Sequence, residues 1–557
     1  MPLILHYAKR FKWRIAVIIF LSILNGLASI AILNFINTKL LNADSFGFTT
    51  FIAFVFTLIA FLFIQTLAQI CLAALGHKIV FLLRRQLIKQ IIDSSYQQIR
   101  NQGKAKILAS LNTDIDNISR IFMNLPDVIQ GAVLAICTGF YLAHLSAPLL
   151  GVTVICFAIM LLGMHFIVRT VVRSFKKYRA TKDFLSADYQ AVLDGHRELK
   201  LNNKRAHKFY EQRLTPHAEN SRALIVRTDF FHYLGNNYFD VMVLILVGLI
   251  FYLAYAFALA TIETTITFAV TILFVRNFIS QAVASISDIT IGFVSTQKIQ
   301  QLDFAPFTPE FSGQDALNPN WQTIRFENVT YTYPKQQNEV EGSKQTSQFA
   351  LKPLNFTLKR GEVTFLIGKN GSGKSTLALL LSGLVEPTSG KIYVDNTPLT
   401  PELFHSYRGM ISSVFSDFYL FNEIPADDTP ETNALIEQWL DLLQIREKVE
   451  IIDQSLSTTS LSTGQRKRLA LLVAIAEQRS FMILDEWAAD QDPAFRYTFY
   501  HQILPLIQKR GVTIFAISHD DAYFDMADNI FLINKGELRI LNAQERLTEA
   551  HLAVENL

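Results

Sequence analysis

Between two apolar runs the sequence reads Gly368-Lys369-Asn370-Gly371-Ser372-Gly373-Lys374-Ser375-Thr376. The run before it, residues 363–367, has the length of a buried strand, and the run after it, residues 377–381, reads as the continuation of a helix. A glycine-rich turn between a strand and a helix lets backbone N–H groups wrap an anion without Cβ clashes. The positive end of the helix dipole adds to that attraction.

The pattern G-x-x-x-x-G-K-S, flanked by a strand and a helix, is that of a phosphate-binding loop. Lys374 can reach the β- and γ-phosphates of a nucleoside triphosphate, and the Ser375 hydroxyl is placed to ligate Mg²⁺. All nine residues of the loop are expected to contact the nucleotide. The sequence therefore predicts ATP and Mg²⁺ as cofactors.

The composition indicates a membrane part followed by a soluble part. Of 557 residues, half are hydrophobic and only 18% are charged, whereas soluble domains average about a quarter charged. The apolar excess lies in the first half of the chain. The net charge of +3, with no basic stripe outside the membrane flanks, argues against a nucleic-acid partner.

Six apolar runs are long enough to cross a lipid bilayer, which takes about 20 residues. We expect the spans at residues 15–36, 50–76, 126–145, 147–168, 232–258 and 264–285. The N-terminal flank and the two long connections, after the second and the fourth span, are rich in Lys and Arg. The other connections are short and nearly uncharged. The positive-inside rule therefore places both termini and both long connections in the cytoplasm.

The long connections continue the helical alternation of apolar and charged positions beyond the membrane, over residues 77–100 and 169–200. Each turns at a polar break, one near residues 101–103 and the other near residues 201–204. Such tips are suitable docking points for an ATPase, although solvated hairpin turns are the alternative. Prolines and glycine at residues 303–320 predict a linker, and residues 335–348 predict a surface loop.

Two motifs downstream of the phosphate loop complete an ATPase. Residues 481–484 form an apolar strand that ends in Asp485, expected to hold Mg²⁺, and Glu486, expected to polarise the attacking water as general base. The second motif reads Leu461-Ser462-Thr463-Gly464-Gln465, and a helix over residues 466–478 follows it. This is a second phosphate-facing helix start. One chain cannot easily point both loops at one nucleotide, so a dimer with shared sites is predicted.

Two further residues are candidates for nucleotide contact. His519 follows the apolar run 512–517 and is positioned to contact a γ-phosphate. Tyr333 can stack on adenine, with Tyr331 as the rival candidate and a core aromatic as the structural alternative.

In this order the motifs resemble the nucleotide-binding domain of ABC transporters, and six spans ahead of that domain resemble an ABC half-exporter. The resemblance implies a membrane α-helical bundle of six transmembrane helices (residues 1–302), a linker (303–320) and an α/β P-loop ATPase domain (321–557). It also implies a homodimer with domain-swapped spans, coupling helices at both cytoplasmic tips, and alternating access driven by ATP.

The chain departs from the usual family pattern at three places. Ser416 stands where most members carry a glutamine, so Asp417 is a candidate for the link to Mg²⁺. The loop after Glu486 reads Trp-Ala-Ala-Asp-Gln-Asp-Pro, and the stretch 416–461 is short, which implies a reduced helical subdomain. With the motif at residues 195–201, these features resemble the bacterial exporters of cyclic peptides and peptide siderophores.

Polar residues inside the spans are candidates for cargo contact because an ionisable group there is costly. We single out Asn25, Asp240, Arg276 and Asn277. Arg276 and Asn277 are expected to line a central cavity; pairing of Arg276 with Asp240 or Asp288, which would only hold the bundle together, is equally compatible with the sequence.

The function predicted is ATP-driven export of a peptide-like compound across the bacterial inner membrane. Its partners would be a second copy, the lipid bilayer and the cargo, with a periplasmic or outer-membrane partner left open. A lipid or multidrug exporter of the same architecture is the first alternative. A non-transporting regulator or channel is the second, although such proteins often lose the catalytic carboxylate that Glu486 supplies here.

Overall fold

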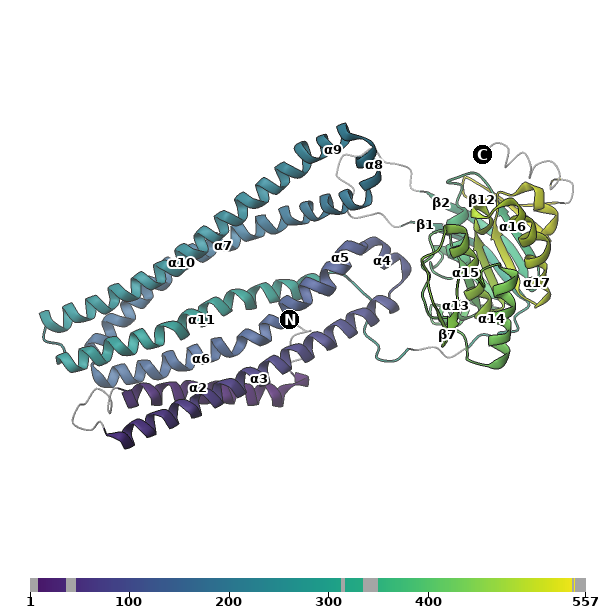
Figure 1. Ribbon diagram of the computed structural model, residues 1–557. Helices are drawn as coiled ribbons and strands as arrows, with labels where there is room; N and C mark the ends of the chain where they lie inside the picture. The colour runs from purple at the N-terminus through teal and green to yellow at the C-terminus, as the bar shows by residue number, and fades with distance from the viewer. Residues whose placement is uncertain (1–8, 37–46, 312–315, 334–348, 543–544, 546–557) are drawn as a thin grey trace. The chain divides into compact units, whose positions relative to one another are not determined.

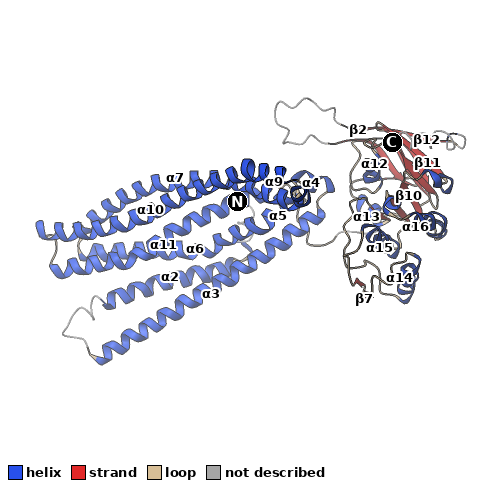
Figure 2. Cartoon of the chain, turned by 45° about the horizontal axis from the view of Figure 1, so that its top comes forward, coloured by secondary structure: helices blue, strands red, loops and turns tan. Residues whose placement is uncertain are grey.

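The computed structural model describes residues 9–36, 47–311, 316–333, 349–542 and 545. Contacts divide the chain into two units, the first formed by Met1–Ile88 and Ala105–Asp303 and the second by Lys89–Lys104 and Phe304–Leu557. The first unit is entirely helical in its described part, and the strands belong to the second (Figure 2). The surface loop expected at residues 335–348 lies outside the described residues.

Six long helices form the first unit (Figure 1). They are α2 (Lys12–Phe35), α3 (Phe48–Asp93), α6 (Ile115–Leu145), α7 (Ala147–Asp194), α10 (Thr215–Ala256) and α11 (Ile262–Gln300). Each of the six lies in a helical stretch that is long and apolar enough to cross a membrane, as the sequence predicts. Large apolar side chains are exposed on the surface of these helices; Phe56, Phe63 and Phe140, for example, are each at least two-thirds exposed.

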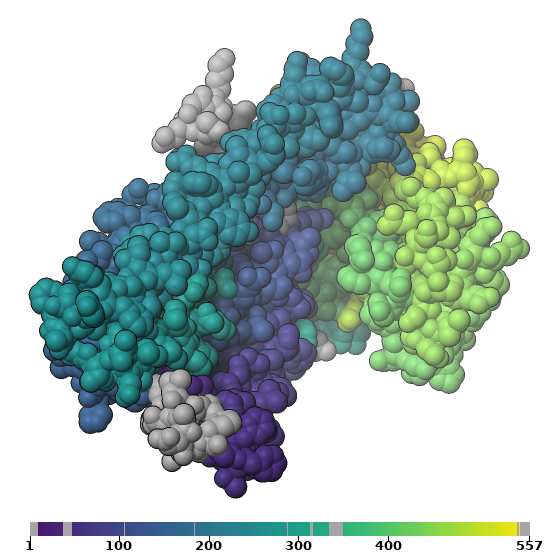
Figure 3. Space-filling view, turned by 60° about the vertical axis from the view of Figure 1, so that its left-hand side comes forward, coloured from purple at the N-terminus to yellow at the C-terminus, as the bar shows by residue number. Residues whose placement is uncertain are grey.

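Two helix pairs organise this unit. Helix α6 packs along α11, and α7 packs along α10. Small residues permit the close approach: a Cβ on Gly131 of α6 would lie 2.5 Å from Cβ of Ala282 on α11. The α7–α10 pair diverges from the α6–α11 pair toward the end that carries α8 (His196–Leu201) and α9 (Asn203–Phe209), as Figures 1 and 3 show.

The long helices end earlier than the polar breaks predicted from sequence. Helix α3 stops at Asp93, because Ser95 caps a new helix, α4 (Tyr96–Gln102), in a capping box with Gln98. Helix α7 stops at Asp194, and Gly195 separates it from α8. The predicted continuous helices over residues 77–100 and 169–200 are therefore wrong in detail. Helix α5 (Lys104–Ala109) and two π-helical turns, η3 (Ser110–Asp114) and η4 (Tyr210–Leu214), lead into the returning helices.

The second unit contains two main sheets. The smaller, antiparallel sheet has the order β2-β1-β4-β5, formed by Ala350–Lys359, Thr323–Thr332, Ser389–Val394 and Thr397–Pro398. The larger sheet has the order β12-β11-β3-β10-β9-β6. Its strands are Glu537–Leu541, Asn529–Asn534, Val363–Ile367, Thr513–Ile517, Phe481–Asp485 and Ile411–Val414. Strands β11, β3, β10, β9 and β6 run parallel, and β3, β9 and β10 are fully buried.

Helices pack around the larger sheet. They are α12 (Lys374–Leu381), α13 (Phe404–Gly409), α14 (Pro430–Leu442), α15 (Thr463–Ala476), α16 (Pro493–Thr498) and α17 (Leu504–Lys509), with single turns η5 (Trp487–Asp490), η6 (Phe499–Ile503) and η7 (Asp521–Met526). Between β6 and α15 the chain has one helix, α14, and a two-residue hairpin, β7 (Ile451–Ile452) with β8 (Ser455–Leu456). This is the short helical subdomain expected from the length of the segment.

Candidate functional site

The register of the parallel sheet brings the ATPase motifs to one edge. Ile367 of β3 and Asp485 of β9 lie at the ends of strands that flank β10, and Ile517 is the last residue of β10. Glu486 N–H donates to the Ile517 carbonyl (3.1 Å), and Ser518 N–H donates to the Leu366 carbonyl (3.3 Å). Ligands of open parallel sheets bind at this carboxyl edge. The phosphate loop, Asp485, Glu486 and His519 therefore meet in one place.

Backbone geometry explains the glycine that opens the phosphate loop. Gly368 has φ +153°, and a Cβ there would lie 2.2 Å from the carbonyl oxygen of Ile533 on β11. Helix α12 begins directly at Lys374, after Gly373 in the left-handed conformation. The helix N-terminus and the loop N–H groups therefore form a cradle for a phosphate.

Lys374 is held inside this loop. Its side-chain Nζ donates to the Gly368 carbonyl (2.7 Å) and the Lys369 carbonyl (3.4 Å), and the residue is buried. Burial lowers the pKa of Lys374, while the charges of Glu486 and Asp485 oppose that shift. An ammonium group with neutral carbonyl partners can turn to the phosphates of a bound nucleotide.

The candidate Mg²⁺ ligands offer oxygen atoms, which this hard cation prefers. Asp485 is buried, and burial, with a contribution from the Glu486 charge, raises its pKa. Ser416 Oγ donates to Asp485 Oδ2 (3.3 Å), whereas the Asp417 side chain is exposed. Ser416 is thus the residue that takes the position beside Asp485; a role for Asp417 toward Mg²⁺ stays a prediction.

Glu486 and His519 form the candidate catalytic pair. Their side chains share a hydrogen bond between Glu486 Oε1 and His519 Nε2 (3.1 Å). Glu486 is partly exposed, so its carboxylate can accept a proton from a water, and His519 orients that carboxylate. Glu486 has φ +50° and ψ +39°, a left-handed conformation that is unusual for a non-glycine residue.

The two tyrosine candidates occupy different environments. Tyr331 lies in the core of the smaller sheet and is 3% exposed, so it cannot offer a ring face to adenine. Tyr333 is partly exposed, and its hydroxyl hydrogen-bonds to Thr376 of α12 (3.1 Å). The guanidinium of Arg100 on α4 lies 5.6 Å from the Tyr333 ring centroid, a contact that sequence reasoning missed.

In the second predicted phosphate-contacting motif, residues 461–465, the helix begins three residues earlier than predicted from the sequence. Helix α15 starts at Thr463, because Ser462 caps it in a capping box with Gln465. Ser462 and Thr463 are exposed, and Leu461, Gly464 and Gln465 are partly buried. The exposed helix start can therefore approach a phosphate group carried by another molecule.

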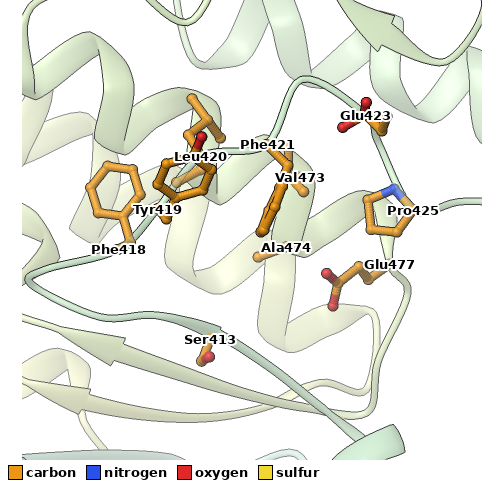
Figure 4. A pocket seen from close by; sticks show the side chains of 11 residues that line it. Ser413, Phe418, Tyr419, Leu420, Phe421, Glu423, Pro425, Val473, Ala474 and Glu477 are labelled. Carbon is orange, nitrogen blue, oxygen red and sulfur yellow. The ribbon is translucent and has the colours of Figure 1, made fainter. Parts of the chain in front are cut away.

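An apolar cavity of about 310 Å³ opens beside α15 (Figure 4). One wall is the segment after β6, including Phe418, Tyr419 and Phe421. The other is formed by α15 and its C-cap residue, at Ala470, Val473, Ala474 and Glu477. Tyr419 is 78% exposed and Phe421 66%. Large exposed aromatics around a cavity indicate a surface for another protein segment.

In the membrane unit, Arg276 of α11 is paired with Asp240 of α10: Nε donates to Oδ1 at 3.0 Å. Of the two alternatives drawn from sequence, the structure therefore contains the ion pair. Asn277 is exposed beside it, and Asn25 of α2 is 3% exposed, with an Oδ1 atom that lacks a hydrogen-bond partner within the described helices. Contact of these residues with cargo stays a proposal.

Comparisons with known proteins agree with this architecture. The family model "ABC transporter transmembrane region" matches residues 15–283, and the model "ABC transporter" matches residues 351–489. The ATP-binding protein SyrD of Pseudomonas syringae pv. syringae is 30% identical over 533 residues, which cover 92% of each chain. The nisin transport ATP-binding protein NisT of Lactococcus lactis subsp. lactis is 30% identical over 253 residues, 42% of this chain and 40% of NisT.

A solved structure shares the fold. The ATP-bound form of a bacterial Atm1-family ABC exporter superimposes with a TM-score of 0.78 at 17% identity, covering 98% of this chain and 97% of that one. Membrane helices and an ATPase domain are fused in one chain, and SyrD matches 92% of it. This protein therefore belongs to the ABC transporter family and is an ATP-hydrolysing membrane transporter.

Proposed function

We propose that this transporter exports a peptide-like compound across the bacterial inner membrane. The observation that carries the proposal is the likeness to SyrD, which spans the membrane helices as well as the ATPase domain. Partial likeness to a protein named for nisin transport supports the same direction. The sequence features after β6 and β9, which resemble those of exporters of cyclic peptides and peptide siderophores, support this cargo class.

We propose further that the working form is a homodimer. The start of α15 is exposed at Ser462 and Thr463, so a second copy can bring its nucleotide to that helix. In such a dimer each chain supplies the phosphate loop, Asp485, Glu486 and His519 for one ATP, and Leu461 to Gln465 for the ATP of its partner. Mg²⁺ would be held by Ser375 and Asp485 and would offset negative charge on the phosphates.

The charge pattern supports an orientation with the N-terminus and the ATPase domain in the cytoplasm. The apolar cavity beside Tyr419 and Phe421 is a suitable receiving surface for a cytoplasmic tip of the second copy. Leu201, which ends α8, is 88% exposed and offers an apolar side chain for such a contact. Through this contact, a conformational change caused by ATP binding would be transmitted to the membrane helices.

The test is ATPase activity of the purified protein in lipid, with and without a panel of cyclic and siderophore peptides. We expect at least one peptide to stimulate hydrolysis and Glu486→Gln to abolish the stimulated activity. Hydrolysis that responds to lipids or drugs, and to no peptide, would favour the lipid or multidrug exporter. Transport of the stimulating peptide into inside-out vesicles would establish direction.

A further inference from the structure

We propose that Lys467 is a positioning residue for Glu486, an inference that rests on the proposed role of Glu486 as general base. Lys467 lies in the second turn of α15 and is 3% exposed. Its Nζ donates to the backbone carbonyl of Glu486 (2.7 Å) and forms an ion pair with Asp490 Oδ2 (2.7 Å). An ammonium group thus sits directly against the peptide unit that carries the catalytic carboxylate.

Glu486 needs such support because its backbone is left-handed. A non-glycine residue in this conformation is unfavourable and persists only where the surroundings hold it. On one side, Glu486 N–H donates to the Ile517 carbonyl; on the other, the Glu486 carbonyl accepts from Lys467. The two bonds orient the backbone so that the carboxylate reaches His519 Nε2.

The ion pair explains why a lysine can be buried here. A buried ammonium is costly unless it is paired and hydrogen-bonded, and Asp490 and the Glu486 carbonyl satisfy both conditions. The Asp490 side chain is itself 47% exposed, so it remains hydrated if the lysine is removed. A second hydrogen bond joins the same two segments, because the indole N–H of Trp487 donates to the Lys467 carbonyl (2.8 Å).

Neighbouring contacts make α15 and the loop after Glu486 one rigid piece. Gln491 is 4% exposed; its Nε2 donates to the Gly464 carbonyl (3.1 Å), and its Oε1 accepts from Arg468 Nε (2.8 Å). A Cβ on Gly464 would lie 2.8 Å from the Asp490 carbonyl oxygen. The helix therefore cannot slide along the loop, and Lys467 is held at a constant position relative to Glu486.

The test uses the full-length protein in lipid and the variant Lys467→Met, which keeps the apolar stem and removes the donor. We expect kcat for ATP to fall about tenfold or more, as a small misplacement of a catalytic group does, with the Kd for ATP changed by less than about twofold. Lys467→Gln retains a donor and should recover part of the lost kcat. Lys448→Met, a change of an exposed lysine, is the matched control and should behave as the parent protein.

A folded Lys467→Met protein with unchanged kcat would overturn the proposal. Parallel loss of kcat, ATP affinity and thermal stability would also overturn it, because it would show a purely structural role. In the Glu486→Gln background Lys467→Met should cause no further loss of hydrolysis, since the group it positions is already absent. If Lys467→Met does not fold, Asp490→Ala decides: it should lower kcat at unchanged ATP affinity, and full kcat there would refute the proposal.

Discussion

The ion pair between Arg276 and Asp240 can be tested by a double-mutant cycle of Arg276→Met and Asp240→Asn. The side chains are 27% and 44% exposed, so the pair is only partly buried. Removal of one partner from a fully buried pair costs about 3–5 kcal/mol, and we expect about 1–3 kcal/mol here because water or lipid headgroups can reach the remaining charge. That loss corresponds to a fall of a few degrees in Tm.

The double variant separates bundle stability from cargo contact. In the double variant both charges are removed, so no charged group is left without a partner. The Tm of the double variant should therefore be higher than the summed losses of the two single variants imply, and the coupling free energy should be about 0.5–3 kcal/mol. The measurement is thermal unfolding of the full-length protein in lipid, followed by intrinsic fluorescence. Strictly additive losses would refute the pairing argument.

The same proteins report on the cargo proposal. If Arg276 only holds α10 against α11, the double variant should regain peptide-stimulated ATPase activity together with stability. If Arg276 also binds cargo, the double variant should be stable and unresponsive to the peptide. Asn277→Ala, a change of the exposed neighbour, distinguishes a local cavity contact from a general effect on the bundle.

Three further outcomes are expected. Glu486→Gln should lower kcat for ATP by about 10²–10⁴-fold while ATP binding persists, and loss of binding in an equilibrium titration would contradict its role as general base. Gly368→Ala should abolish ATP binding because the added Cβ would overlap a backbone carbonyl of β11. The control Gly361→Ala is also at positive φ, but its Cβ would lie in open space, so this variant should only lower folding stability. Equal effects of the two variants on ATP affinity would contradict this account. Burial by itself would raise the pKa of Asp188, but hydrogen bonds from His217 and Arg213 outweigh burial and lower the pKa. This carboxylate therefore stabilises the fold at pH values above its unfolded pKa, and the stabilisation is lost as the pH falls through the lowered folded-state pKa. Asp188→Asn should flatten the acid side of a curve of Tm against pH, and an unchanged curve would show that Asp188 does not contribute to stability.

The local sequence pattern was sufficient to predict a site wherever a single segment contains both the secondary structure and the functional residues. The phosphate loop needs a strand, glycines and a helix in succession, and residues 363–381 show all three. The apolar spans follow from length alone, because a bilayer imposes a minimum on each helix. Helix ends were predicted less well: Ser95 and Ser462 are caps whose reciprocal partners, Gln98 and Gln465, could have been read three residues downstream.

The order of the motifs along the chain is a property of the sequence, and it sufficed to indicate a fused transporter with an ATPase that hydrolyses ATP. Tertiary structure decided which side chains meet. The sheet register joins Glu486 to His519 across 33 positions, burial separates Tyr331 from Tyr333, and packing of α10 on α11 pairs Arg276 with Asp240. Lys467 carries no motif of its own, and its contact with Glu486 exists only because α15 and the end of β9 pack together. Such contacts depend on the arrangement of elements distant in the chain, which periodicity and spacing do not encode.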